Sequence, residues 1–121
     1  MTNHVYWTID AKLADGKADA LNEVCAKCSA LTKDNEPGAL AYEWWLSEDN
    51  STVHIYERYT DSAAVMAHMG NVGPHLPELM ALIVEPKVTM YGSPDETVRG
   101  AFADFKPLYM TNHVGGFHRH S

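Results

Sequence analysis

Hydrophobic and polar residues alternate in some stretches of the chain and follow helical spacing in others, and this switching predicts the order of the elements. Apolar side chains occupy every second position over residues 5–13, which is typical of a strand with one buried face. From Leu21 onward the apolar residues recur at helical spacing. This spacing predicts an amphipathic helix that is capped at Asp15 and ends near Thr32.

The alternation returns over residues 40–46 and 53–59, and the polar turn between these stretches predicts an antiparallel pair of strands. A helix capped by residues 60–62 follows and is interrupted by the glycines and proline of residues 70–74. We then expect a helix that includes Ile83 and ends at Pro86, and a fourth strand around Val88. A capping box that begins at Ser93 starts a short C-terminal helix carrying Phe102.

The resulting β-α-β-β-α-β order with an extra C-terminal helix predicts an α+β protein of the ferredoxin-like class. We expect a four-stranded antiparallel sheet with helices on one face, formed by residues 1–92, and a C-terminal helix and tail of residues 93–121 packed on the same domain. Both faces of the first three strands carry bulky groups, as Trp44 and Trp45 show. A sheet that is apolar on both faces needs a second cover, which predicts a homodimer that pairs through the sheet faces.

Composition narrows the classes of partner. The chain has 121 residues, 45% of them hydrophobic, and 9 basic against 16 acidic residues give a net charge of −7. This balance argues against a nucleic acid or an anionic membrane as partner. No stretch approaches the roughly 20 apolar residues of a membrane span, and the N-terminus lacks the pattern of a secretory signal. With two cysteines only, we expect a cytoplasmic protein with reduced thiols.

An ordered set of short motifs runs through the middle of the chain. It consists of Glu36-Pro37-Gly38, Tyr42-Glu43, Ile55-Tyr56-Glu57-Arg58-Tyr59, Asp61, Ala63-Ala64 and His68. Together these motifs resemble the antibiotic biosynthesis monooxygenase family, over a span from Val5 to Tyr91. In the tail, Glu96, Val98, Arg99 and Gly115-Gly116-Phe117 resemble an extension found in some members. One departure is Tyr59, where the family often has tryptophan.

The resemblance implies a dimeric α+β barrel of ferredoxin-like subunits. For the characterised enzymes it implies oxygen insertion into quinols or aromatic polyketides without metal, flavin or haem. The electron-rich substrate anion reacts with O₂ itself, while the protein supplies deprotonation, orientation and a dry pocket. The family also contains haem-degrading members and proteins that act on signalling molecules, so the fold alone does not define the reaction.

Two residues are the main candidates for acid–base chemistry. His68 lies on the inward side of its helix and could accept a phenolic proton, or it could be a half-buried histidine bonded to a carbonyl group or water. Glu57 shares a strand face with Val53 and Ile55, where a buried carboxylate must be paired or protonated. It could orient His68 or hold a substrate hydroxyl, or it could form a structural pair.

Aromatic and polar residues supply candidates for substrate binding. Tyr42 and Tyr59 combine an apolar body with a polar tip, and we assign Tyr42 as an orienting group and Tyr59 to the pocket wall. Asn71 and His75 complete the wall near the break between the helices. Trp7, with Trp44, could stack on a flat substrate, although packing in the core and the dimer is the commoner fate of strand tryptophans.

Metal and cofactor signals are weak. Cys25 and Cys28 lie in the apolar stripe of a helix without a second pair, so we expect them to pack in the core. The spacing of His68 from His75, and the terminal pair of His118 and His120, match no metal site. There is no glycine-rich dinucleotide motif or P-loop. The haem-degrading branch of the family needs an asparagine on its first strand, and the first strand predicted here has none other than Asn3 at its very start. We therefore expect no metal and no cofactor.

These observations predict a cofactor-independent monooxygenase that oxidises a small quinol, phenol or polyketide-like aromatic compound with O₂. The alternative is a small-molecule binding protein, an isomerase or a signal-processing protein that performs no oxygenation. Haem degradation is a further alternative with less support. The tail could act as a lid, with Gly115-Gly116 as its hinge and Phe117 as its plug.

Overall fold

The computed structural model describes residues 2–119, so His120 lies outside the described part of the chain. The strands are β1 (Val5–Leu13), β2 (Ala39–Leu46), β3 (Thr52–Tyr59), β4 (Ile83–Gly92) and β5 (Leu108–Met110). The helices are α1 (Ala18–Asn35), α2 (Ser62–Val72), α3 (Leu76–Met80) and α4 (Glu96–Ala101), with short 3₁₀ turns η1 (Gly73–His75) and η2 (Ala103–Phe105). Among these helices, none is long and apolar enough to cross a membrane.

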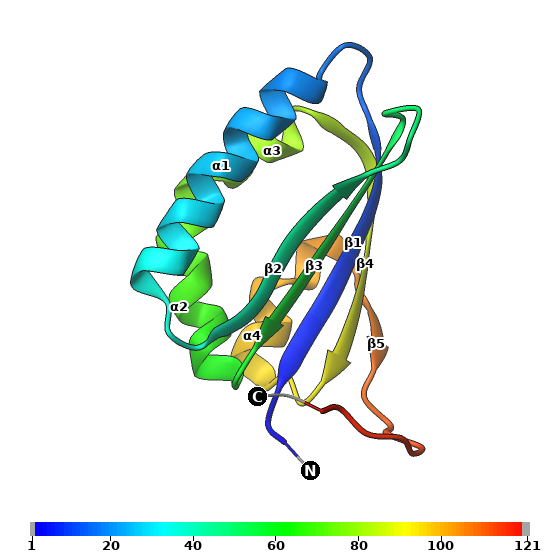
Figure 1. The fold of residues 1–121 in the computed structure, drawn as a ribbon. Coiled ribbons are helices and arrows are strands. Elements are labelled where there is room, and N and C mark those ends of the chain that lie inside the picture. Colours follow the sequence, from blue (N-terminus) through cyan, green and yellow to red (C-terminus); the bar gives the residue numbers. More distant parts are fainter. Residues whose placement is uncertain (1, 120–121) are drawn as a thin grey trace.

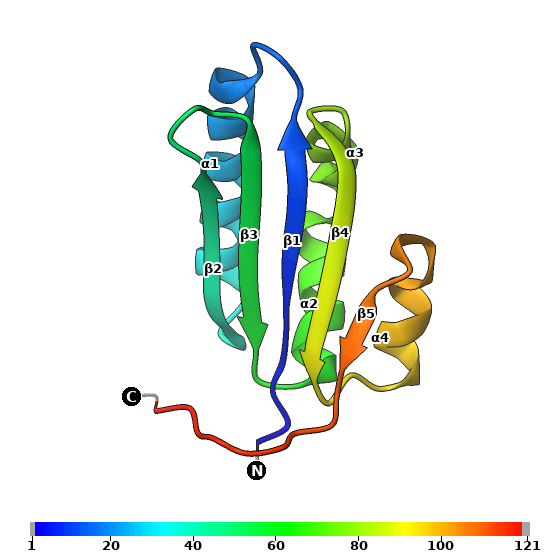
Figure 2. The same ribbon diagram turned by 90° about the vertical axis from the view of Figure 1, so that its right-hand side faces the viewer.

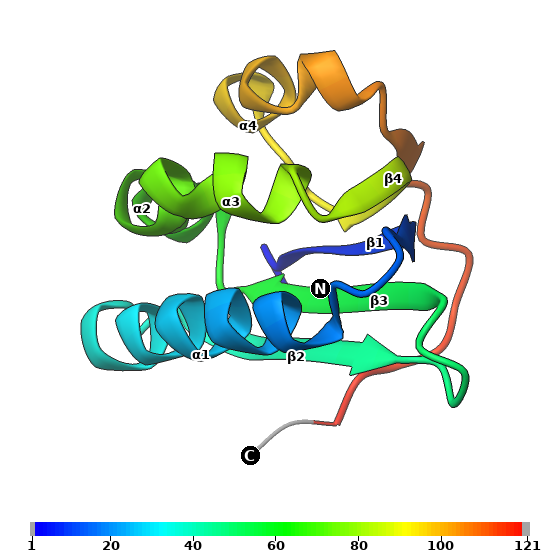
Figure 3. The same ribbon diagram turned by 90° about the horizontal axis from the view of Figure 1, so that it is seen from above.

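The sheet has the strand order β2-β3-β1-β4-β5, and the pairs β2–β3, β3–β1 and β1–β4 are antiparallel. This order and the β-α-β-β-α-β succession define the ferredoxin-like α+β fold that the sequence predicts. Helices α1, α2 and α3 all cover one face of the sheet (Figure 1). Seen from above, α1 lies over the β2 side, α2 and α3 lie over the β4 side, and α4 lies beyond β4 (Figure 3).

The sheet differs from the prediction because it has a fifth strand. Strand β5 pairs with β4 in the parallel direction, so the sheet is five-stranded and mixed instead of four-stranded and antiparallel. Parallel neighbours need a crossover connection of about a dozen residues or more. Residues 93–107, which contain α4 and η2, provide that connection. A strand of three residues is too short to produce a recognisable alternation in the sequence.

The boundaries of several elements also differ from the prediction. Ile83 begins β4 and does not belong to a helix, because α3 already ends at Met80. Pro86 lies inside β4, directly after Glu85, which has a φ of 53°. The pairing of β4 with β1 shifts its register at this point, and a bulge is one of the few places where a strand accepts proline. At the start of α4, Asp95 is the cap, and its Oδ1 accepts the backbone N–H of Val98 at 2.9 Å.

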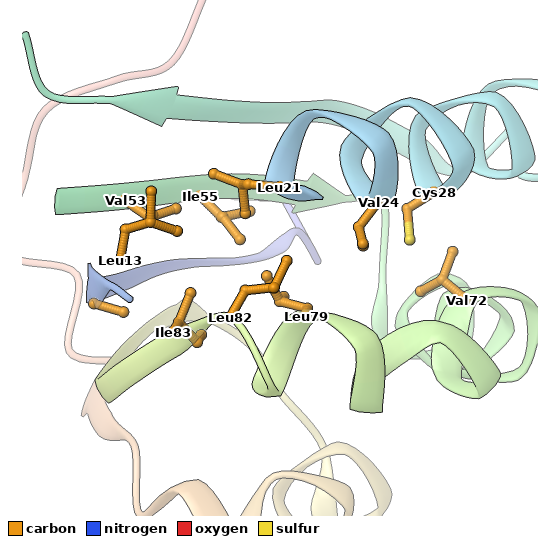
Figure 4. Close-up of a cluster of buried hydrophobic side chains, with 11 residues drawn as sticks. Leu13, Leu21, Val24, Cys28, Val53, Ile55, Val72, Leu79, Leu82 and Ile83 are labelled. Atoms are coloured by element: carbon orange, nitrogen blue, oxygen red, sulfur yellow. The ribbon is translucent and has the colours of Figure 1, made fainter. Parts of the chain in front are cut away.

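Two clusters of buried side chains form the core between the helices and the sheet. The first joins α1 and α3 to the sheet and contains Cys28, which is unpaired and buried (Figure 4). The second surrounds Trp7 and includes Val98 and Phe102 of the C-terminal segment. Val98 and Phe102 therefore share a core with Trp7 of β1.

The opposite face of the sheet is not covered by any helix among residues 2–119 (Figure 2). Trp45 on this face is 62% exposed. Tyr6 stacks on Tyr91 with ring centroids 5.1 Å apart, and the guanidinium of Arg58 lies 4.1 Å above the ring of Tyr6. On this face Trp45 is thus exposed, Tyr6 and Tyr91 are half-buried, and Arg58 is buried.

Candidate active site

His68 lies at the centre of a buried charged cluster on the inner face of α2. The helix begins at Asp61, whose carboxylate accepts the backbone N–H of Ala64 at 2.8 Å. Helical spacing then turns Val65, His68 and Val72 toward the sheet. Only 3% of the His68 surface is exposed.

Two carboxylates hold the imidazole of His68 from opposite sides. Its Nδ1 lies 2.9 Å from Oε1 and 3.1 Å from Oε2 of Glu36, and its Nε2 lies 3.0 Å from Oε1 of Glu57. All three side chains are buried. We call this arrangement the Glu36–His68–Glu57 array. A histidine with a carboxylate at each ring nitrogen is arranged to donate from both nitrogens, as only the imidazolium form can.

Glu36 is placed by the end of helix α1. It is the residue at the C-terminal cap, and its backbone N–H donates to the carbonyl group of Thr32 at 3.0 Å. The Nδ2 of Asn71 donates to Glu36 Oε2 at 2.7 Å and to the carbonyl group of Leu31 at 2.9 Å. Asn71 therefore fixes both the carboxylate and the end of α1 against α2.

Glu57 is held by donors from three elements. The hydroxyl of Tyr59 donates to its Oε1 at 2.7 Å, and the indole N–H of Trp7 donates to its Oε2 at 3.0 Å. Trp7 and Glu57 face each other across the β1–β3 register, so the strand pairing itself brings them together. With His68 as the third donor, the carboxylate has the partners that a buried charge requires.

The array shifts the ionisation of its neighbours. Burial acts to lower the pKa of His68, but the hydrogen bond and charge of Glu57, followed by those of Glu36, outweigh it and raise the pKa above its ordinary value. Burial raises the pKa of the Tyr42 and Tyr59 hydroxyls, and the charge of Glu57 adds to the effect. The surroundings therefore favour the imidazolium form of His68 and the neutral phenols of Tyr42 and Tyr59.

A narrow apolar pocket opens beside the array. Its volume is about 50 Å³, and its lining includes both Glu57 and His68. The surrounding wall is contributed by the sheet, α2, α3 and the C-terminal segment, with Ile9, Val88, Met69, Leu76, Phe102 and Phe105 among its members. An acid–base pair at the wall of an apolar pocket can transfer a proton to or from a bound molecule while water is excluded.

The predicted site residues fall into two groups. Five of them line the pocket, namely Trp7, Tyr42, Glu57, His68 and His75. Tyr59 and Asn71, which the sequence assigns to the pocket wall, lie behind it and hold the two carboxylates. His75 is half-buried, and its Nδ1 lies 3.1 Å from Oε2 of Glu78.

Sequence reasoning assigned no role to Glu36 or to the phenylalanines of the C-terminal segment. The available signal for Glu36 was its place in the Glu36-Pro37-Gly38 motif of the family resemblance. Phe102 and Phe105 reach the pocket wall, whereas Phe117, the expected plug, is 82% exposed and is not among the lining residues. Among residues 2–119, no group of three or more histidine, cysteine or acidic side chains could hold a metal ion.

The fold and the array define a small ferredoxin-like α+β protein with a buried acid–base centre beside an apolar pocket. The sequence profile of the family described as antibiotic biosynthesis monooxygenase matches residues 5–76. The chain therefore belongs to this family, as its motifs predict. A search of the curated protein sequences found no match.

Solved structures share the fold at low sequence identity. MupZ from Pseudomonas fluorescens is 22% identical, with a TM-score of 0.82 over 97% of this chain and 95% of that one. Rv0793 from Mycobacterium tuberculosis is 21% identical, with a TM-score of 0.64 over 77% and 97%. The N63A mutant of SnoaB, a cofactor-independent oxygenase from Streptomyces nogalater, is 18% identical, with a TM-score of 0.62 over 77% and 95%.

Proposed function

We propose that this protein is a cofactor-independent monooxygenase that oxidises a small quinol, phenol or polyketide-like aromatic compound with O₂. The observation that carries the proposal is the Glu36–His68–Glu57 array at the wall of an apolar pocket. Membership of the antibiotic biosynthesis monooxygenase family supports it, as does the shared fold with SnoaB, a cofactor-independent oxygenase.

In the proposed reaction the protein accepts a proton from the substrate and stabilises the negative charge that remains on it. Glu57 faces the pocket and takes the proton of the bound substrate, and the His68 imidazolium stabilises the anion that forms. The anion supplies electrons to O₂ and forms a carbon–oxygen bond, and the resulting peroxide anion takes back the proton from Glu57 to give a hydroperoxide. Loss of water from the hydroperoxide leaves one oxygen atom as a new carbonyl group and the other in water, so an activated CH₂ group becomes C=O.

Because the pKa of His68 is raised, we assign the roles of His68 and Glu57 differently from the sequence-based expectation that His68 accepts the proton. A general base must begin without the proton that it accepts, whereas the neighbouring Glu57 and Glu36 raise the pKa of His68 and so favour its protonated form. We therefore assign proton acceptance to the Glu57–His68 pair, with Glu57 as the acceptor. Glu36 and Asn71 are positioning residues, because they contact His68 or its partner but do not line the pocket.

The neutral hydroxyl of Tyr42 and the ring of Trp7 would orient a flat substrate in the pocket, which His75 also lines. The same geometry argues against haem degradation through His68, since a carboxylate occupies each of its ring nitrogens and no axial ligand is left on that residue.

The proposed assembly is a homodimer in the cytoplasm, formed through the helix-free face of the sheet. The exposed Trp45 on that face supports this assembly, because an exposed apolar surface is typical of an interface. The net charge of −7 and the two unpaired cysteines agree with the location.

One observation favours a second function of a different class. The array combines a carboxylate with an imidazolium, so it could remove a proton from one atom of a carbonyl compound and return a proton to another. Such an isomerase would use the same pocket and would consume no O₂. Its product would form equally well under argon.

Oxygen uptake by metal-stripped protein, with a panel of reduced quinols and anthrones, tests the proposal. We expect uptake above the uncatalysed rate, and a loss of about a hundredfold or more in His68→Gln and Glu57→Gln. Glu43→Gln is the matched control, because Glu43 is an exposed carboxylate on the other face of β2. Uptake that survives both substitutions would refute the assigned roles. Conversion of a carbonyl compound under argon, without uptake from any of the quinols, would favour the isomerase.

A further inference from the structure

The pocket beside the array is smaller than the molecules proposed for it. Its volume is about 50 Å³, whereas an apolar cavity of about 150 Å³ holds a single benzene molecule. A quinol or a phenol contains at least one such ring. Because protein interiors are close-packed and compress very little, a ring enters this pocket only if a side chain of its wall moves out.

Most of the aromatic side chains in the wall are fixed in place. Trp7 is 1% exposed, and its indole N–H donates to Glu57 at 3.0 Å. Phe102 is 4% exposed and packs edge-on against Trp7, with the ring centroids 4.9 Å apart. Tyr42 and Trp44 belong to β2, which is paired along its length with β3. Turning Trp7 or Phe102 away from the pocket would break the core cluster that both belong to.

Phe105 lines the same pocket but is anchored differently. It is half-buried and lies at the edge of the core cluster around Trp7, with its ring centroid 6.3 Å from that of Phe102. Phe105 is the last residue of η2, a turn of only three residues, and the following residue, Lys106, has a left-handed φ of 47°. Among these wall residues, Phe105 is therefore the one whose ring can turn outward to solvent while the sheet and the core stay in place.

We propose that Phe105 closes the pocket in the free protein and turns outward when an aromatic ligand enters. The side chain that leaves carries a benzene ring, so its departure frees the space that one ring of the ligand needs. We call this residue the Phe105 gate. The inference rests on the proposed function for the class of ligand, an aromatic compound, but its test does not need the reaction.

The chain contains three phenylalanines, which differ widely in exposure. Phe102 is 4% exposed, Phe105 is half-buried and Phe117 is 82% exposed. Incorporation of 4-fluorophenylalanine gives one fluorine signal for each of them, and single Phe→Leu substitutions assign the signals. The change in the chemical shift of a signal between H₂O and D₂O reports how far that ring contacts solvent. In the free protein we expect this change to be smallest for Phe102 and largest for Phe117.

Phenol, added under argon, is the probe with a single ring. We expect phenol to raise the H₂O/D₂O shift change of Phe105 toward the value of Phe117 and to leave that of Phe102 as it is in the free protein. This measurement uses the unsubstituted chain, so it does not depend on the folding of any variant at position 105. A phenol complex in which the Phe105 signal keeps its free-protein shift change overturns the Phe105 gate.

Phe105→Ala removes the gate and leaves Glu57 and His68 in place. Exposing a half-buried phenylalanine to water weakens binding about tenfold, so without this cost the dissociation constant of phenol should fall about tenfold. Phe117→Ala is the matched control, because it removes the same ring from an exposed position that does not line the pocket, and it should leave the constant unchanged. Equal constants for the wild type and Phe105→Ala, or no binding of phenol by either, would show that Phe105 is not a gate.

The outcomes separate this inference from the proposed function. If phenol displaces Phe105 while no quinol is oxidised, the Phe105 gate stands and the oxygenase proposal fails. If quinols consume O₂ while the ring of Phe105 stays in the wall of the phenol complex, the oxygenase proposal stands and the Phe105 gate is wrong.

Discussion

His68 shows how two neighbouring carboxylates can reverse the usual effect of burial on a single side chain. An imidazole in an apolar interior tends to lose its proton, because the charged form is poorly solvated there. Here Glu36 and Glu57 each lie about one hydrogen-bond length from a ring nitrogen and favour the cation instead. The cation in turn offsets one of the two negative charges that a pair of ionised carboxylates would bring into the interior.

The raised pKa of His68 predicts a pH dependence of stability. A group whose pKa is higher in the folded state adds stability that is fully present below its unfolded-state pKa, near 6.5, and is lost as the pH rises through the folded-state pKa. Each unit of difference corresponds to about 1.4 kcal/mol. Glu36→Gln removes one of the two charges, so we expect the wild type to lose unfolding free energy more steeply than this variant above pH 6.5.

Urea unfolding from about pH 6 to about pH 9 measures this difference. The remaining titratable groups are shared by both proteins, so their contributions cancel when the two pH profiles are compared. Parallel profiles over this range would mean that Glu36 does not hold the proton on His68.

The sequence indicates some members of the array and not others, for a physical reason. His68 and Glu57 could be predicted because the helical and strand periodicities put them on apolar faces, where a charged side chain needs an explanation. Glu36 follows the end of a helix, where carboxylates are commonly solvated. Its burial arises from contacts with His68 and Asn71 on α2, which periodicity within α1 cannot reveal.

At the scale of elements, the connection between α1 and β2 places Glu36 against α2. Gly38 allows the close approach: a Cβ atom at this position would lie 2.7 Å from the Cβ of Ala64 and 3.1 Å from Oγ1 of Thr60. The backbone of Gly38 also accepts the N–H of Thr60 at 3.0 Å. The packing of this turn on the start of α2 thus determines where the carboxylate of Glu36 lies relative to His68.

Gly38→Ala should therefore be destabilising, by about 1–3 kcal/mol, because the added methyl group overpacks the contact with α2. The midpoint of urea unfolding measures this change. Gly100→Ala is the matched control: nothing lies within 4 Å of a Cβ atom at that position in α4, so the substitution should be neutral or slightly stabilising. Equal midpoints for the two variants would show that the turn can yield without cost.

The elements themselves were predictable to different degrees. Strands β1, β2 and β3 alternate over eight or nine residues and are placed within a residue of their observed bounds. Ile83 continues the helical spacing of α3 in sequence, yet tertiary pairing with Leu13 makes it the first residue of β4. The parallel strand β5 depends on the crossover through α4 and could not be found from local pattern.

At the scale of the whole molecule, the two faces of the sheet have different surroundings. One face, with α1, α2 and α3, contains the core and the pocket. The other presents Tyr6, Tyr91 and Trp45 without a covering helix (Figure 2). Alternation along the strands predicts that both faces are bulky, but a single sequence does not identify what covers the second one.

The proposed homodimer predicts a mass of about twice the 13.4 kDa of one chain by light scattering. Trp45→Lys puts a charge on the helix-free face, and we expect it to shift the equilibrium toward the single chain, since desolvating an unpaired ammonium group opposes association. Ala30→Lys adds the same charge to an exposed position of α1, on the other side of the sheet, and should leave the mass unchanged.

Because the pocket lies entirely on the helix side of the sheet, Trp45→Lys should still bind small molecules in the pocket when the dimer is lost. A wild type of single-chain mass would leave the apolar face without the partner proposed for it, and a dimer insensitive to Trp45→Lys would move the interface to another surface.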